Sequence, residues 1–155
     1  MGCLTSCKPM QTIEITVPGV PVGKQRPRVT ATHTYTPQKT KDYERHIREC
    51  WLEQSNKRFK DNTELSLMVK AFFPIPKSLS KKKKMELDGS GYTHKCDIDN
   101  LIKSVADALN GYAYDDDSRI VMVLATKRYS FEPRVDISIR GAEFAEEDET
   151  GKQPM

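Results

Sequence analysis

Five aspartates in two short segments are the residues of this chain best suited to chemistry. The first segment carries Asp97 and Asp99, and the second is the run 115–117. In an extended stretch, residues two apart point to the same side, so Asp97 and Asp99 can address one point. A cluster of aspartates that binds through carboxylate oxygens alone suits a hard cation such as Mg²⁺ or Mn²⁺. The pattern predicts a metal site for phosphodiester hydrolysis, because a bound metal activates water and neutralises charge on the phosphate.

Each of these residues also has an ordinary structural explanation. Asp99 could cap a helix, and the run 115–117 could be a solvated turn. Lys103 follows Asp99 by one helical turn and shares a face with Asn100 and Asp107, so it could stabilise negative charge on a phosphate. The alternative for Lys103 is a surface ion pair with Asp99 or Asp107.

The two aspartate segments flank a predicted helix, residues 100–109, which Asn110 and Gly111 would close. Such a helix is about 15 Å long, so the loop after Gly111 must fold back if the segments are to meet. Residues 120–129 form a predicted strand whose apolar stretch, 120–125, suggests a central strand covered on both faces. The short link 130–133 predicts an antiparallel hairpin with the strand at 134–140.

The rest of the chain predicts two more strands and two more helices. Residues 13–17 and 65–73 alternate as half-buried strands do. Helix 37–54 is expected to begin with Thr36 as its cap, and a short helix follows Ser78 or Ser80 to about Leu87. The order β-α-β-(α)-α-β-β in 155 residues indicates a single-domain α+β fold, with a mixed β-sheet packed against helices.

The excess of basic residues in most of the chain indicates a polyanionic partner. The net charge is +3, but without the acidic segment 143–155 the body carries 24 basic and 17 acidic residues, a net charge of +7. Two basic stretches are the candidate DNA contacts, although four consecutive lysines can also form a solvated turn. Their residues are Lys24, Arg26 and Arg28 in a proline-containing loop, and Lys81, Lys82, Lys83 and Lys84 in the lysine run.

Several functional classes lack support in the sequence. No apolar stretch is long enough for a membrane helix and no secretory signal is present, so a cytoplasmic location without membrane contact is expected. No glycine-rich phosphate loop occurs, so no nucleotide cofactor is expected. The four cysteines show no zinc-ligand spacing and the three histidines no catalytic triad.

In combination, these motifs resemble the RusA family of Holliday junction resolvases, including members common in phages and prophages. The similarity spans residues 12–140 and is carried by the runs 97–103 and 107–111, and by Asp116-Asp117 before Ile120-Val121; residues 23–28 and 74–78 also match. Cys96 stands where proline is common, which we expect to change only the stiffness of the loop. The resemblance divides the chain into a flexible leader (1–10), an endonuclease domain (11–141) and a disordered acidic tail (142–155).

The resemblance implies a crossover junction endodeoxyribonuclease that acts in DNA recombination and repair as a homodimer on branched, four-way DNA. It implies that Asp97, Asp99 and Asp117 bind catalytic Mg²⁺, with Asp116 as the alternative distal ligand, and that Lys103 is the catalytic lysine. Two other functions remain open at this point. One is a metal nuclease that cuts other branched DNA, and the other is a DNA-binding module whose aspartates are only caps and turns.

Overall fold

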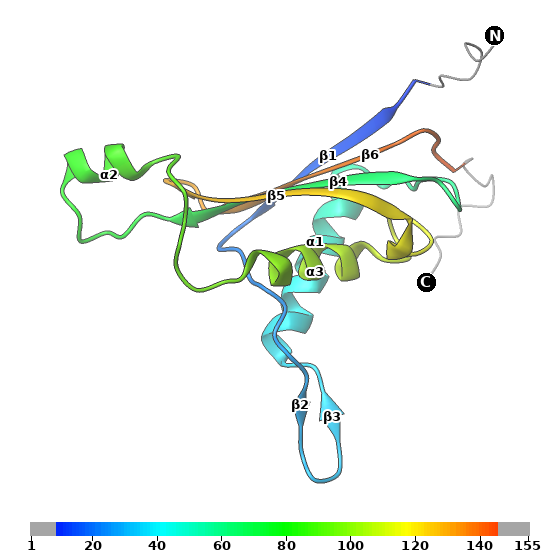
Figure 1. Ribbon diagram of the computed structural model, residues 1–155, viewed down its shortest axis with the longest axis horizontal. Coiled ribbons are helices and arrows are strands. Elements are labelled where there is room, and N and C mark those ends of the chain that lie inside the picture. Colours follow the sequence, from blue (N-terminus) through cyan, green and yellow to red (C-terminus); the bar gives the residue numbers. More distant parts are fainter. Residues whose placement is uncertain (1–8, 146–155) are drawn as a thin grey trace.

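The computed structural model describes residues 9–145, and its centre is a four-stranded mixed sheet (Figure 1). The strands lie in the order β1-β6-β4-β5. Strand β6 pairs antiparallel with both of its neighbours, whereas β5 pairs parallel with β4. The strands are β1 (Gln11–Pro18), β4 (Leu65–Pro74), β5 (Ile120–Ser130) and β6 (Arg134–Gly141).

Two helices cover one face of this sheet. Figure 1 shows α1 (Gln38–Gln54) and α3 (Ile98–Leu109) on the same side of the strands, where they also contact each other. A third helix, α2 (Lys81–Leu87), lies beyond one end of the sheet. The predicted single-domain α+β fold, with a mixed sheet packed against helices, is confirmed. None of the helices in the described part of the chain is long and apolar enough to cross a membrane.

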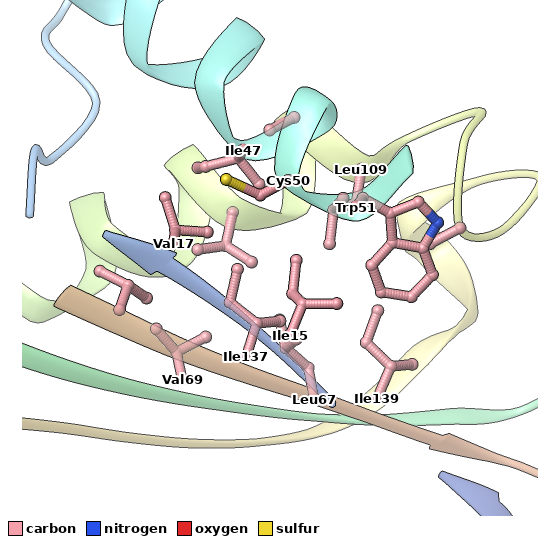
Figure 2. Packing of buried hydrophobic residues seen from close by; sticks show 14 of the residues in the cluster. Ile15, Val17, Ile47, Cys50, Trp51, Leu67, Val69, Leu109, Ile137 and Ile139 are labelled. Carbon is pink, nitrogen blue, oxygen red and sulfur yellow. The ribbon is translucent and has the colours of Figure 1, made fainter. Parts of the chain in front are cut away.

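The core lies between the sheet and these two helices. Alternate strand residues point toward the helices and form rows across the sheet, such as Ile15, Ile137 and Val69. Figure 2 shows Ile47 and Trp51 of α1 lying over these rows. Burying one such aliphatic side chain contributes about 1.5–3 kcal/mol, so this layer is what holds α1 and α3 against the strands.

Strand β5 differs from its prediction in two ways. It lies at the edge of the sheet, and β4 separates it from β6, so the expected β5–β6 hairpin is wrong. It is also not covered on both faces, since four successive apolar residues are exposed: Val121 61%, Met122 61%, Val123 40% and Leu124 54%. An apolar run fits a central strand, but it does not specify which strand lies beside it.

Residues 25–35 form an arm that the sequence did not predict as regular structure. Strands β2 (Arg28–Val29) and β3 (Thr34–Tyr35) pair antiparallel, and every residue from 25 to 35 is exposed. The Thr30 amide donates to the carbonyl of His33 at 2.7 Å and closes the turn. Figure 1 shows this arm projecting away from the sheet and helices.

The helix starts agree with the sequence only in part. Helix α1 begins at Gln38, and Pro37 rather than Thr36 is its N-cap, because Pro37 has an extended ψ of 142° and its carbonyl accepts from the amide of Thr40. Helix α2 begins after Ser80, whose hydroxyl accepts from the amide of Lys83, so the short helix and one of its two predicted caps are confirmed.

The chain ends fall largely outside the described residues. Most of the predicted leader (1–10) and the part of the predicted tail from 146 to 155 are not described. Residues 142–145 pack against the body: Phe144 lies 5.0 Å from Phe59 between ring centroids, and the Ala145 amide donates to the carbonyl of Arg58.

Candidate active site

The N-terminal end of α3 holds the first two aspartates. Asp97 is the N-cap residue, and its backbone carbonyl accepts from the amides of Asn100 and Leu101 at 3.1 and 3.2 Å. Its carboxylate makes no capping hydrogen bond, and Asp99 lies in the first turn rather than at the cap. Both residues are exposed. The capping explanation for Asp99 is therefore wrong, and two carboxylates face solvent where the helix dipole favours negative charge.

The chain enters this end of α3 through an unusual backbone conformation. Cys96 has a φ of 122°, a region that L-residues rarely adopt. Lys127 holds the loop by donating from Nζ to the carbonyl of Cys96 at 2.8 Å. A proline is restricted to a φ near −65°, so it could not follow this path. The expectation that cysteine in place of proline alters only loop stiffness stays a prediction.

A polar stripe runs along α3 from these aspartates. Lys103 is exposed and Asp107 is half-buried, whereas Leu101, Val105 and Leu109 are buried on the opposite side of the helix. Lys103 has no ion pair or hydrogen bond to any residue between 9 and 145. The predicted stripe is confirmed, and the ammonium group of Lys103 is available to an external anion.

Lys24 is tied to this stripe. Its ammonium group is hydrogen-bonded to Asp107 and lies 3.4 Å from Glu44 Oε1. Burial lowers the pKa of Lys24, but the bond to Asp107 and the charge of Glu44 outweigh burial and raise it overall. Lys24 is thus a cation held between α1 and α3, and its predicted contact with DNA stays a prediction. The sequence carried no signal for Glu44, which is one acid among several on α1.

The second aspartate segment places its three carboxylates in different environments. Asp115 accepts from Arg119 at 2.9 Å, and this hydrogen bond lowers the pKa of Asp115. Asp116 accepts from the hydroxyl of Ser118, which likewise lowers its pKa. Asp115 is therefore already neutralised within the chain, which leaves Asp116 and Asp117 as the candidate ligands.

The pKa of Asp117 is raised, in contrast to the lowered pKa values of Asp115 and Asp116. Asp117 begins the short 3-10 helix η1 (Asp117–Arg119) just before β5. Burial raises its pKa, and the neighbouring charges of Asp116 and Asp107 raise it further. A cation bound beside Asp117 would remove the repulsion between these carboxylates. A carboxylate that a cation would stabilise in this way is a reasonable metal ligand.

One copy of the chain does not bring the predicted ligands together. Asp117 lies near Asp107 in the last turn of α3, whereas Asp97 is the N-cap and Asp99 lies in the first turn. Asp99 and Asp107 are eight residues apart, which is about 12 Å along the helix. Figure 1 shows the yellow turn before β5 at the C-terminal end of α3. Within residues 9–145, no three Asp, Glu, His or Cys side chains are grouped so that they could hold a metal ion. The metal assignment therefore stays a prediction.

Asp117→Asn is expected to raise thermal stability at pH 7.5 in EDTA. A carboxyl whose pKa is higher in the folded chain destabilises the folded state once ionised, and this cost disappears as the pH falls toward the ordinary Asp pKa of about 3.9. Melting curves at pH 7.5 and pH 4.5 test this, because the gain should shrink at the lower pH. Asp116→Asn is the control, since its lowered pKa predicts a loss of stability at pH 7.5.

The two tyrosines of this region pack against neighbouring parts of the chain. Tyr114 is buried, and its hydroxyl donates to the carbonyl of Ala106 at 2.6 Å. This bond fixes the turn after α3 against the helix. Tyr112 is half-buried under Arg48, whose guanidinium carbon lies 5.6 Å from the ring centroid.

Comparisons with known proteins agree with the motifs around these residues. The family model described as Endodeoxyribonuclease RusA matches residues 18–140, which include all of the candidate site residues. The chain is also similar to the uncharacterized protein YqaN of Bacillus subtilis (strain 168), with 39% identity over 139 residues that cover 84% of this chain and 97% of that relative. The chain belongs to the RusA family of endodeoxyribonucleases.

Proposed function

We propose that this protein is a Mg²⁺-dependent endonuclease that resolves four-way DNA junctions as a homodimer. One observation carries the proposal: in a member of the RusA family, the exposed end of α3 presents two carboxylates without capping bonds and, one turn later, an unpaired lysine. Carboxylates and a lysine arranged in this way suit a phosphodiester substrate, since the acids take a divalent cation and the lysine takes the phosphate.

The chain's own residues would have separate tasks. Asp97, Asp99 and Asp117, or Asp116 in its place, would hold Mg²⁺ or Mn²⁺, and the bound cation would supply an activated water and neutralise charge on the phosphate. Lys103 would donate to a non-bridging phosphate oxygen, where negative charge grows during cleavage. Lys24 neutralises Asp107 and so keeps a further negative charge away from the approaching DNA.

The exposed cations suit contacts with the DNA backbone. Arg26 and Arg28 lie on the projecting arm, and the chain has no acidic residue from position 19 to position 41. On α2, Lys81, Lys82 and Lys83 are exposed beyond the end of the sheet. These two groups project from different parts of the molecule (Figure 1), so they would hold different arms of a branched substrate.

Arg26→Ala combined with Arg28→Ala is expected to weaken binding to junction and duplex DNA alike. Each lost phosphate contact should lower the slope of log affinity against log salt by about 0.9, so the double variant should lose nearly 2. Binding titrations between 50 and 200 mM salt measure this slope. The control is Lys57→Ala with Lys60→Ala, which removes the same charge beyond the C-terminal end of α1. An equal loss in the control would contradict the arm as a DNA contact.

The proposed function is tested by nicking of an immobile four-way junction with mapped cut positions. The expected result is symmetrically paired nicks in MgCl₂, none in EDTA, and slower cleavage of flap and linear duplex DNA. A flap cleaved faster than the junction would instead indicate a nuclease for other branched DNA. Equal binding in EDTA with no cleavage under any condition would indicate a DNA-binding module.

A further inference from the structure

The arm of residues 25–35 exposes apolar side chains on both of its faces. Val29 is 77% exposed and Tyr35 is 44% exposed. Tyr35 lies opposite Arg28 in the ladder, and directly opposed residues share one face of a ribbon. Val29 follows Arg28 in the same strand, so its side chain points to the other face. The arm therefore presents a tyrosine ring on one face and a valine on the other.

The tip of the arm is small, uncharged and closed by hydrogen bonds. The Thr30 hydroxyl donates to the carbonyl of His33 at 3.0 Å, and the amide of His33 donates to that hydroxyl at 3.0 Å. Both bonds add to the one between the Thr30 amide and the same carbonyl. Residues 29–35 contain no Asp, Glu, Lys or Arg. A hairpin that is already formed loses little conformational freedom on binding, so the arm can enter a narrow opening as it stands.

The surroundings of the tip are cationic. Arg26 and Arg28 precede it, Lys39 and Lys41 follow it, and no acidic residue occurs between positions 19 and 41. An apolar tip above a cationic base fits a partner that is anionic outside and apolar inside. DNA has this arrangement, since its phosphates face solvent and its bases stack in the interior.

The root of the arm is fastened beside the N-terminal end of α3. The amide of Lys24 donates to the carbonyl of Asn100 at 2.9 Å. Gly23 lies so close to this turn that a Cβ on it would be 3.2 Å from Cβ of Asn100. The amide of Gln25 donates to Thr40 Oγ1 of α1 at 3.2 Å. DNA that the arm engages is therefore held at a fixed position relative to this end of α3, which carries two of the candidate metal ligands.

We propose that the arm is a wedge that enters the branch point of DNA, where Tyr35 stacks on a base pair at one side and Val29 covers a base pair at the other. The inference rests on the proposed function for its substrate. It goes beyond that function by naming the side chains that distinguish a branch point from linear duplex.

The selectivity of such a wedge follows from the cost of inserting it. In a linear duplex each base pair is stacked on two neighbours, and an inserted side chain must first unstack them. At a branch point the strands exchange and the stack is interrupted, so the ring of Tyr35 can cover a base-pair face without breaking a continuous stack. The arginines of the arm contribute on either substrate, because contacts to phosphates position DNA without reading it. The apolar pair supplies the difference.

Affinities of a matched pair of substrates test the wedge. V29S/Y35A is expected to lower the affinity for an immobile four-way junction about tenfold, and to leave the affinity for linear duplex within about twofold of wild type. Titrations in Ca²⁺ followed by fluorescence anisotropy measure both. Y35F keeps the ring and should keep the junction preference. F131A removes an aromatic side chain that is 57% exposed between β5 and β6, and it should change neither affinity.

A probe in the DNA tests the stacking directly. The emission of 2-aminopurine depends on how the neighbouring bases stack on it. Wild-type protein is expected to change the emission of this base when it lies beside the branch, and to leave it unchanged in the middle of a duplex. V29S/Y35A should change neither, although at saturating protein the junction is fully bound. Circular dichroism melting curves check that the variant folds as wild type does, as the exposure of both side chains leads us to expect.

The outcomes separate the wedge from the proposed function. Equal losses on junction and duplex, or no loss on the junction, would overturn the wedge. A lower mass of V29S/Y35A by light scattering would show that the arm covers another protein chain, which would overturn it as well. Wild-type protein that binds junctions through the arm but never nicks them would count only against the proposed function. Nicking by V29S/Y35A with wild-type junction affinity would count only against the wedge.

Discussion

Asp99→Asn is expected to abolish junction nicking while DNA binding stays the same or becomes tighter. The substitution removes a carboxylate oxygen from the proposed cation site, which should lower the cleavage rate by about three orders of magnitude. Asp99 is exposed in the first turn of α3 and makes no capping bond, so the fold should remain intact. Loss of one negative charge beside the phosphate favours DNA binding. Single-turnover cleavage and a binding titration in Ca²⁺ measure the two effects separately.

The matched control for this variant is Asp88→Asn, which makes the same chemical change at an exposed position after α2. It should cleave at the wild-type rate. Nicking by Asp99→Asn at more than a tenth of the wild-type rate would remove Asp99 from the catalytic site, and a parallel loss of DNA binding would indicate a structural role instead.

Lys103→Met is expected to lower the single-turnover rate by about 10²–10³-fold with little change in DNA affinity. Methionine keeps most of the length of lysine but loses the ammonium group, which has no partner among residues 9–145. The lost interaction would be made mainly in the transition state, so the rate constant should fall while the dissociation constant stays nearly unchanged. Mn²⁺ stoichiometry should also be unchanged, which separates this lysine from the aspartates.

Two further variants test whether the effect depends on a positive charge at position 103. Lys103→Arg keeps the charge and should recover part of the lost rate. Lys57→Met removes a lysine just after the C-terminal end of α1 and should have no effect. If Lys103→Met weakened binding as much as it slowed cleavage, the lysine would be one phosphate contact among others.

Most individual elements could be predicted because their signals are local. Alternation along residues 11–18 and 65–74, and the capping role of Ser80, depend on neighbours within a few positions. The neighbours of β5 could not be predicted, because strand order depends on residues that are far apart in the chain. The apolar run from Ile120 to Ala125 predicted a central strand, but such a run does not specify which strands lie beside it.

In the candidate site, too, the features with local sequence signals could be predicted and those that depend on distant residues could not. The types and spacing of Asp97, Asp99 and Lys103 were sufficient to identify candidate residues, and the polar stripe on α3 followed from helical periodicity. Whether Asp117 reaches them depends on the path of the turn after α3, which Tyr114 fixes through its bond to Ala106. The pairing of Lys24 with Asp107 joins residues 83 positions apart, and no local pattern records such a contact.

The position of β6 affects how this protein must fold during synthesis. Strand β1 is synthesised before the other described strands, yet its ladder partner β6 is the last strand among residues 9–145, with Gln11 opposite Gly141. At about 5–20 residues per second, the 130 positions from Gln11 to Gly141 take roughly 6–26 s, which is how long β1 waits for its partner. The sheet therefore completes only after β6 has been synthesised, and a premature stop before residue 134 would leave β1 and β4 without the strand that joins them.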